Sequence, residues 1–254
     1  MQIPEYFSQR HTVRQYSDKE ISTQQLNAML DAASHAPNTG NMQWYSVIVT
    51  RDDEQKRRLA PLHFGQPQIC DANVVLTFCI DLRRFELWCR KREAEPGFDN
   101  FQSFVASMID TSLVAQQLCT VAEMQGIGTC YLGTTTYKAR QIAEVLDLPV
   151  RVVPVATVTL GYPSSGKVAD GGSWRLPVSA WVHDETYHEP SAADIDSWYA
   201  SLEADPQSQK FIDENNKKTL AQVFTDVRYP RTSAEQFSKA YLDFIKENGF
   251  GTEY

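Results

Sequence analysis

Two arginines and a threonine near the start of the chain have the types and spacing of an anion-binding site. The stretch Arg10-His11-Thr12-Val13-Arg14 precedes the first convincing helix of the 254-residue sequence. Arginine offers a planar fork of donors that stays charged at any working pH, and threonine adds a neutral donor. A phosphate monoester, with about two negative charges near neutral pH, suits such a set. On spacing alone, an ordinary solvated surface is the better explanation of two arginines four residues apart.

A second polar stretch, Asn38-Thr39-Gly40-Asn41-Met42-Gln43, lies between an expected helix and an expected strand. Ser22 and Gln25 form a capping box for that helix, and Pro37 ends it. Residues 44–50 are rich in strand-forming types. A loop of small polar residues between two packed elements is a place where a ligand can meet backbone donors, although a plain turn fits the same residues.

Two further turns carry groups that could contact a bound ligand. Gln66 offers both a donor and an acceptor in the turn Phe64-Gly65-Gln66-Pro67. Leu132-Gly133-Thr134 follows a strand-like run, and a glycine there lets backbone N–H groups approach a planar ligand closely. The elements expected to position these turns are strands over 73–80, 128–132 and 152–160 and helices over 53–62 and 137–146.

The longest helical pattern covers residues 101–125. It is apolar around much of its circumference, which is typical of a helix buried in a core or against a second subunit. Gly126 is well placed to end it. The pair Gly126-x-Gly128 is not a dinucleotide-binding fingerprint, because its spacing differs and a helix rather than a strand precedes it.

The remaining segments frame the expected site and its C-terminal side. Residues 82–100 have no clear period and are expected to form an insertion over one rim of the site. Residues 178–182 are expected to form a final short strand. A last helix is expected over 233–248, with Ser233 and Gln236 as its capping box.

The domain organisation expected from these patterns is simple. The sequence has no internal repeat and no low-complexity linker. We therefore expect one domain over 1–190 and a helical C-terminal extension over 191–254. The apolar face of the last helix indicates that the extension packs on the body or on a partner subunit.

Composition excludes several classes of function. The net charge of −8 argues against a nucleic-acid partner. No signal peptide and no run of about 18 apolar residues is visible, so a cytoplasmic protein without a membrane partner is expected. The five cysteines never form a C-x-x-C pair, which favours buried free thiols over a zinc site or a disulfide framework. The spacing of His183 and His188 suits no metal site.

Five motifs in this order resemble the nitroreductase family of FMN-dependent NAD(P)H oxidoreductases. They are Arg-His-Thr-Val-Arg at 10–14, Ala-Pro-Asn-Thr-Gly-Asn-Met-Gln at 36–43, Leu-Gly-Thr at 132–134, Leu-Gly-Tyr-Pro at 160–163 and Trp-Arg-Leu-Pro at 174–177. The likeness covers most of 8–190 and is greatest to the branch of larger oxygen-insensitive nitroreductases and NADPH-flavin reductases. It implies an α+β fold, with a central mixed or antiparallel sheet flanked by helices, in an intertwined homodimer.

The resemblance implies that Arg10 and Thr12, with His11 between them, hold the FMN phosphate together with Arg175 from a distant loop. One departure affects this set. The branch usually has a lysine two residues before the arginine of the phosphate loop, and this chain has Ser173 there. One positive charge is therefore missing from the implied phosphate site.

The resemblance also implies contacts to the flavin ring. Arg14 would lie beside the N1/O2 edge, where negative charge collects on reduction, and would raise the reduction potential. Asn38 and Gln66 would bond the polar edges of the ring or the ribityl chain, and residues 131–134 would line a ring face near N5. Some contacts would come from the second subunit. The full set of implied cofactor contacts is Arg10, His11, Thr12, Arg14, Asn38, Gln66, Tyr131, Leu132, Gly133, Thr134, Ser173 and Arg175.

A second departure concerns the nicotinamide donor. Close relatives can carry a basic residue two positions after Gln66 that helps recognise the 2′-phosphate of NADPH, and this chain has Gln68. Arg228 and Arg231 could replace it, although each alone is also typical of a solvated loop. The sequence therefore leaves NADPH and NADH open as donors.

The function expected is ping-pong hydride transfer through flavin N5 from NAD(P)H to a nitroaromatic, quinone or flavin acceptor. The cofactor carries the chemistry, so no side-chain acid or base is expected to be essential. Two alternatives stay open: a protein that sequesters FMN without turnover, and another flavin-dependent reductase of this fold, of the reductive dehalogenase or dehydrogenase type. A purified protein without flavin colour would indicate a globular domain without cofactor.

Overall fold

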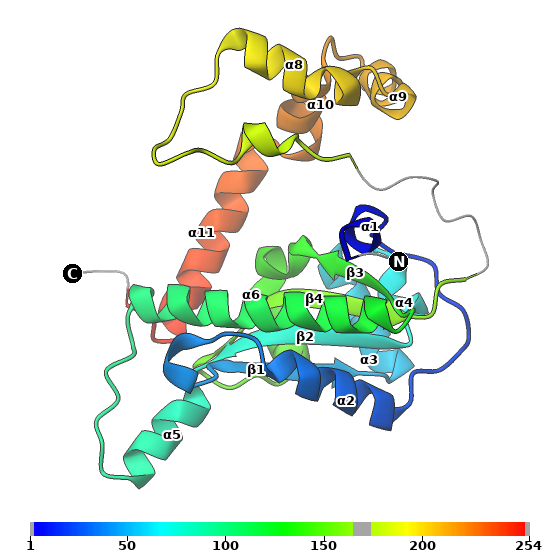
Figure 1. The fold of residues 1–254 in the computed structure, drawn as a ribbon. Coiled ribbons are helices and arrows are strands. Elements are labelled where there is room, and N and C mark those ends of the chain that lie inside the picture. Colours follow the sequence, from blue (N-terminus) through cyan, green and yellow to red (C-terminus); the bar gives the residue numbers. More distant parts are fainter. Residues whose placement is uncertain (1–2, 165–173, 252–254) are drawn as a thin grey trace. The chain divides into compact units, whose positions relative to one another are not determined.

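The computed structural model describes residues 3–164 and 174–251, which Figure 1 draws as a ribbon. The chain divides into two compact units. The larger unit contains Thr12–Val168 and Phe237–Tyr254, and the smaller unit contains Met1–His11 and Ala169–Gln236. The expected boundary between residues 190 and 191 stays a prediction.

The centre of the larger unit is a four-stranded sheet in the order β1-β2-β4-β3. Its strands are β1 (Tyr45–Thr50), β2 (Val74–Asp81), β3 (Gly128–Leu132) and β4 (Val152–Gly161). Every neighbouring pair is antiparallel, so the expectation of a mixed or antiparallel sheet resolves to the antiparallel form. β2 and β4 are buried along their whole length, because helices cover both faces of the sheet. The α+β fold class is confirmed.

Two helices cover one face of the sheet. They are α2 (Thr23–Ser34) and α6 (Phe101–Met124), whose buried side chains share one core with β2 and β4. The Ser22 hydroxyl accepts a hydrogen bond from the Gln25 backbone N–H at 3.1 Å, as expected of the cap. The Gln25 side chain does not complete the capping box and instead donates to the Tyr162 hydroxyl oxygen at 3.1 Å.

By length and composition, α6 is a helix that could cross a membrane. Its mean hydropathy reaches 1.2 over 18 residues. Polar residues interrupt this window, so it is not a continuous apolar run. Central helices of folded domains have the same composition. The polar Ser107, Asp110 and Thr111 of α6 are buried in the structure with hydrogen-bond partners, so this helix serves as the core helix of the larger unit.

Shorter helices cover the other face of the sheet and carry the turns of interest. They are α3 (Asp53–Leu59), η2 (Ala60–His63), α4 (Gln68–Asp71), η3 (Gly133–Lys138) and α7 (Ala139–Val145). A second core joins them to the sheet, and its members include Leu59, Ile69, Cys130, Leu132 and Ile142. This core fixes the Gln66 turn beside the end of β3.

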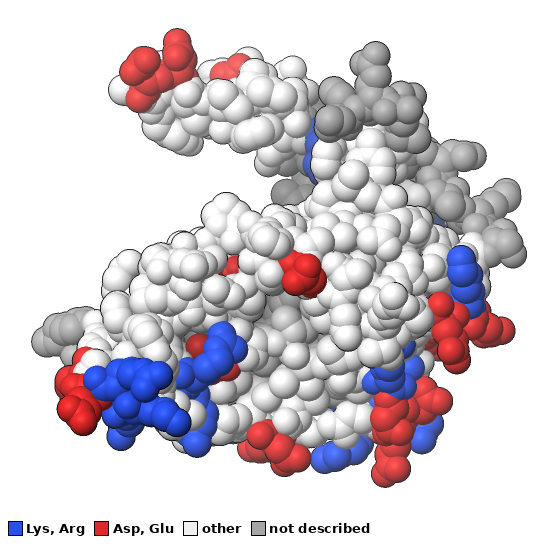
Figure 2. Space-filling view, turned by 60° about the horizontal axis from the view of Figure 1, so that its bottom comes forward, with Lys and Arg blue, Asp and Glu red and all other residues white. Residues whose placement is uncertain are grey.

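The segment expected to be an insertion over one rim of the site contains a helix, α5 (Arg83–Lys91). It carries basic side chains in its first and last turns, and Figure 2 shows them as part of the Lys and Arg cluster at the left margin of that view. The Arg84 guanidinium donates to the Tyr45 carbonyl at 3.1 Å, which ties α5 to the start of β1. The helix was not apparent from the sequence because contacts to residues distant in the chain hold it, namely Phe85 with the Trp44 ring and Glu86 with Arg151.

Two expectations about the C-terminal side are also wrong. Val178–Ala180 form the 3-10 turn η4 rather than a strand. The last helix, α11 (Arg231–Glu247), begins two residues before Ser233, directly after Pro230. Ser233 is therefore inside the helix and does not cap it. The Ala234 N–H donates to the Pro230 carbonyl at 3.1 Å, so helical hydrogen bonding starts ahead of Ser233.

The smaller unit is helical and has a small core. Its helices are α1 (Ile3–Ser8), α8 (Ala192–Glu203), α9 (Pro206–Glu214), α10 (Leu220–Val223) and the π-helical turn η5 (Phe224–Arg228), together with the start of α11. Ile212, Leu220 and Val223 form the core. Several large apolar side chains of this unit are exposed, among them Phe7, Val178, Trp181, Tyr187 and Tyr229. A unit with so little buried surface is marginal by itself.

All five cysteines are free. Four are buried, as expected for thiols that act as small apolar side chains, and Cys70 is exposed.

Candidate functional site

The segment that contains Thr12 and Arg14 runs along the edge of β3. The Val13 N–H donates to the Thr129 carbonyl at 2.9 Å, and the Ser17 N–H donates to the Tyr162 carbonyl at 2.8 Å. The residues on either side of Val13 are therefore held at the edge of the sheet by main-chain bonds.

Gly128 makes this close approach possible. A Cβ atom on Gly128 would lie 2.5 Å from the Cβ of Val13, and β-branched valine cannot rotate away. We expect Gly128→Ala to push the segment with Thr12 and Arg14 off β3 and to lower the free energy of unfolding by about 1–2 kcal/mol. Denaturant unfolding of the FMN-free chain measures this. Gly97→Ala is the matched control, because the same added methyl meets nothing within 4 Å; equal losses in both variants would contradict the steric argument.

Cys130 is a buried thiol near Arg14 and next to the side chain that bonds Gln66. Burial raises the pKa of the Cys130 thiol, and the nearby positive charge of Arg14 partly offsets that rise. The Gln68 amide donates to the Cys130 Sγ at 3.8 Å and to the Gln66 Oε1 at 2.7 Å. The structure thus brings together two residues that the sequence predicted as ring contacts, through two residues that it did not predict.

A second link joins the turn of Gln66 to the turn after β3. The His63 Nδ1 and the Thr134 Oγ1 are 2.9 Å apart. His63 is fully buried, and burial lowers its pKa to about 4, so the ring is neutral near pH 7. Among the described residues its Nε2 has no hydrogen-bond partner.

The end of β3 offers accessible backbone. Leu132 is buried and pairs with Thr157 of β4, whereas Tyr131 is exposed. A Cβ atom on Gly133 would meet nothing within 4 Å, so the space beside its backbone is open. A flat ligand can therefore approach this turn at van der Waals distance, as the sequence predicted from the glycine.

The Asn38 loop is anchored elsewhere in the larger unit. The Thr39 N–H and hydroxyl donate to the Asp110 carboxylate of α6 at 2.9 and 3.0 Å. Burial raises the pKa of Asp110, and the Thr39 donors counter that rise. The Asn38 Oδ1 accepts from the Gln43 N–H at 3.3 Å. Within the described residues, no hydrogen bond joins Asn38 to Arg14 or Gln66.

The predicted phosphate ligands are divided between the two units. Thr12 belongs to the larger unit, and Arg10, His11 and Arg175 belong to the smaller one. The Arg175 guanidinium donates to the Trp174 carbonyl at 2.8 Å. The Trp174 indole in turn donates to the Ser201 Oγ of α8 at 3.0 Å and lies against the Tyr199 ring, so α8 positions the loop. Ser173 lies outside the described residues.

The late-loop arginine considered for the nucleotide phosphate has aromatic neighbours. Its guanidinium lies over the Phe211 ring at 4.4 Å and near the Phe224 ring at 5.6 Å. Arg228 therefore stabilises the smaller unit through cation–π contacts.

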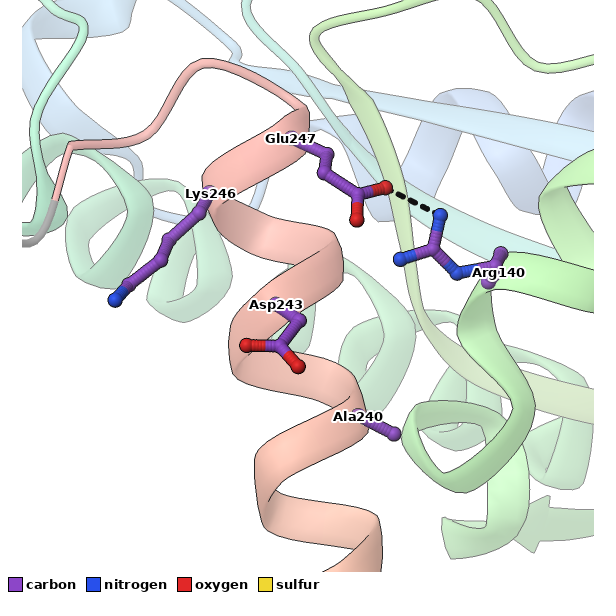
Figure 3. A pocket seen from close by; sticks show the side chains of 5 residues that line it. All are labelled: Arg140, Ala240, Asp243, Lys246 and Glu247. Carbon is purple, nitrogen blue, oxygen red and sulfur yellow. Dashed lines mark hydrogen bonds and ion pairs between the residues drawn. The ribbon is translucent and has the colours of Figure 1, made fainter.

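Two surface hollows of the larger unit contain none of the predicted contacts. Figure 3 shows the first, between α7 and α11, which is lined by Arg140, Ala240, Asp243, Lys246 and Glu247 and contains an Arg140–Glu247 ion pair. The second lies between α2 and α6 and is lined by Ala36, Pro37, Leu113, Gln116, Gln117, Thr120 and Val121. The first mixes charges of both signs and lacks aromatic side chains, which makes it a poor seat for a flavin ring.

Comparison with known proteins identifies the family. The family model described as "Nitroreductase family" matches residues 7–162. This chain belongs to the nitroreductase family. The match contains the Arg10–Arg14 stretch, the Asn38 loop, the Gln66 turn and the turn after β3, and it ends before Arg175. The membership predicted from the five motifs is confirmed.

Relatives of this nitroreductase chain match along nearly its full length. The FMN reductase (NADPH) of Bacillus subtilis is 26% identical over 94% of each chain. A Cr(VI) reductase of Pseudomonas is 27% identical over 98% of each. A crystal structure from Bacteroides fragilis is 47% identical with a TM-score of 0.92 and covers 97% of this chain and 99% of its own. The NADPH:FMN oxidoreductase of Vibrio harveyi, solved with NAD+, shares the fold at 21% identity and a TM-score of 0.78, over 98% of this chain and 99% of its own.

Sequence reasoning missed the residues that brace the site. His63 is a lone histidine at the end of a short charged helix, and Cys130 is one of several isolated thiols, so neither carried a local signal. Gln68 was noticed only as a departure from close relatives. Its side chain is 2% exposed, so it faces inward and cannot take the place of a surface residue that reads a nucleotide phosphate.

Proposed function

We propose that this nitroreductase is a cytoplasmic, homodimeric FMN-dependent NAD(P)H oxidoreductase that reduces a nitroaromatic, quinone or flavin acceptor. The observation that carries the proposal is the buried Gln68 amide, which bonds Gln66 and also Cys130 near the charge of Arg14, together with the open backbone of Gly133. Relatives along the full chain length that are named FMN reductases support the cofactor and the nicotinamide donor.

The donor set suits the polar edge of a flavin. Arg14 would place a permanent positive charge beside the N1/O2 edge, and Gln66 would add a neutral amide donor. Gly133 and its neighbours Tyr131, Leu132 and Thr134 would lie against the ring. Arg10, His11, Thr12, Ser173 and Arg175 would hold the phosphate, and Asn38 would contact the ring or ribityl chain of a cofactor shared between subunits.

The protein's part in the reaction is binding and electrostatics. When bound, FMN supplies the hydride chemistry between the nicotinamide donor and the acceptor. The guanidinium of Arg14 favours negative charge at the edge of the ring that it faces. With the ring against the Gly133 turn, donor and acceptor would bind in turn on its other face, which is a ping-pong order. His63 is buried and neutral and Asp110 is bonded to Thr39, so neither is placed to act as an essential acid or base.

Exposed apolar surface supports the homodimer. On α6, Ile109, Leu113 and Met124 are 54%, 41% and 70% exposed, although the rest of the helix is a core helix. The smaller unit likewise exposes large apolar side chains over a small core. A second copy of the chain would cover both surfaces. We propose that the extension over 191–254 packs partly on that second copy.

The visible spectrum tests the function. We expect the purified chain, reconstituted with FMN, to show a flavin band that bleaches within seconds under anaerobic NADPH or NADH and returns on addition of a quinone. The faster nucleotide names the donor. A bound flavin that neither nucleotide bleaches would favour a sequestering protein. Failure to bind FMN at all would overturn the cofactor assignment.

A further inference from the structure

Gln68 occupies an unusual place for a polar side chain. It is the first residue of the four-residue helix α4 and is 2% exposed, between the sheet and the Gln66 turn. Its amide nitrogen donates to the Gln66 Oε1 at 2.7 Å and to the Cys130 Sγ at 3.8 Å. Burying an amide group costs free energy unless its hydrogen bonds are made. These two hydrogen bonds therefore stabilise Gln68 in its buried position.

The bond from Gln68 fixes which end of the Gln66 amide is available. A glutamine side chain carries one carbonyl oxygen and one NH2 group on the same planar carbon. Because the oxygen of Gln66 is turned toward the buried Gln68, the NH2 group on the other side of the planar amide is the end that is left for a ligand. Gln66 is half-buried and therefore reachable from the surface. The turn thus presents a donor rather than an acceptor.

We infer that Gln68 is a positioning residue that sets Gln66 as a hydrogen-bond donor to a carbonyl oxygen of the flavin's pyrimidine ring. The inference rests on the proposed FMN function. That ring edge carries two carbonyl oxygens and one N–H group, and a donor-only amide pairs with the oxygens and mispairs with the N–H. Cys130 accepts a hydrogen bond from Gln68 and also senses the charge of Arg14, so Gln68 lies in the same part of the larger unit as the second predicted ring contact.

Substitutions at Gln66 test the direction of the bond. Gln66→Glu keeps an oxygen for Gln68 to bond but has no N–H to offer a ligand. We expect the Kd for FMN, measured by fluorescence titration of the apo chain, to rise at least as much as in Gln66→Ala, by about 3- to 10-fold. We also expect the midpoint potential to fall. Wild-type affinity in Gln66→Glu would show that Gln66 accepts a hydrogen bond, and would overturn the inference.

A double-variant cycle tests whether Gln68 acts through Gln66. Gln68→Met keeps a side chain of similar length and removes the donor, and we expect it to raise the Kd for FMN by about 3- to 10-fold. In a Gln66→Ala background the same change should have no further effect. An equal loss in both backgrounds, or no loss in the wild-type background, would overturn the inference. If Gln68→Met does not fold, the Gln66→Glu result decides. Failure of the wild-type chain to bind FMN would instead refute the proposed function.

Discussion

Replacing Arg151 with methionine is expected to lower the free energy of unfolding by about 3–5 kcal/mol, the cost of breaking a buried ion pair. The Arg151 side chain is buried and pairs with Glu86. It also donates to the carbonyls of Gly249 at 2.8 Å and Phe98 at 2.6 Å, and it lies over the Phe250 ring at 4.7 Å. Removing the guanidinium would leave a carboxylate and two carbonyls without that donor. The left-handed backbone of Arg151, at a φ of 74°, adds a strain that these contacts hold.

Denaturant unfolding of the FMN-free chain at fixed pH measures this effect. Arg140→Met is the matched control, because the Arg140–Glu247 ion pair joins side chains that are 40% and 55% exposed. Water screens a pair at that exposure, so its loss should be small compared with the loss in Arg151→Met. Comparable losses in the two variants would mean that burial does not strengthen the Arg151 cluster.

The second large effect is a pH dependence that His63 confers on stability. Burial lowers the pKa of His63 from 6.5 to about 4. Between these two pH values His63 is therefore protonated in the unfolded chain but neutral in the folded chain. The titration of His63 therefore does not reduce the free energy of unfolding above pH 6.5, and it reduces it progressively as the pH is lowered toward 4. Each unit of pKa difference corresponds to about 1.4 kcal/mol, which gives a loss of about 3 kcal/mol between pH 7 and pH 4.

The variant His63→Asn isolates this contribution. Asparagine keeps an amide near the position of the Nδ1 that meets Thr134, and it does not titrate. We expect His63→Asn to be less stable than wild type at pH 7 but to lose about 3 kcal/mol less on acidification. His35→Asn replaces a histidine on the exposed end of α2 and should keep the wild-type difference between the two pH values. A wild-type pH difference in His63→Asn would contradict the assignment.

The strands of the sheet could be predicted from the local sequence, because each is a short run of apolar or strand-forming residues. The apolar run predicted over 73–80 became Val74–Asp81, and 128–132 became β3 without change. The order β1-β2-β4-β3 could not be predicted, because it depends on pairings such as Leu76 with Val158, between which several helices and a strand intervene in the chain. The error at 178–182 has the same origin: within the described part of the chain no strand pairs with those residues, and the backbone turns instead.

The same distinction between local pattern and long-range contact holds for the candidate site. Residue type and resemblance predicted Arg14, Gln66 and the Gly133 turn. The parts that hold them join residues far apart in sequence, namely Gln68 with Cys130 and His63 with Thr134. No local spacing encodes such a contact. The hydrogen bond from Thr39 to Asp110 could not be predicted for the same reason, because the sequence around a carboxylate in an apolar helix does not indicate which distant residue it bonds.

The larger unit is discontinuous, and this sets the order in which it can be completed during synthesis. Its last pieces, Phe244, Ile245 and Phe250, leave the ribosome only after the whole of 169–236. Until then the main core has an open place and Arg151 lacks the carbonyl of Gly249. A nascent chain that has already made all four strands is therefore expected to remain protease-sensitive and dependent on chaperones, and to close only when its final helix arrives.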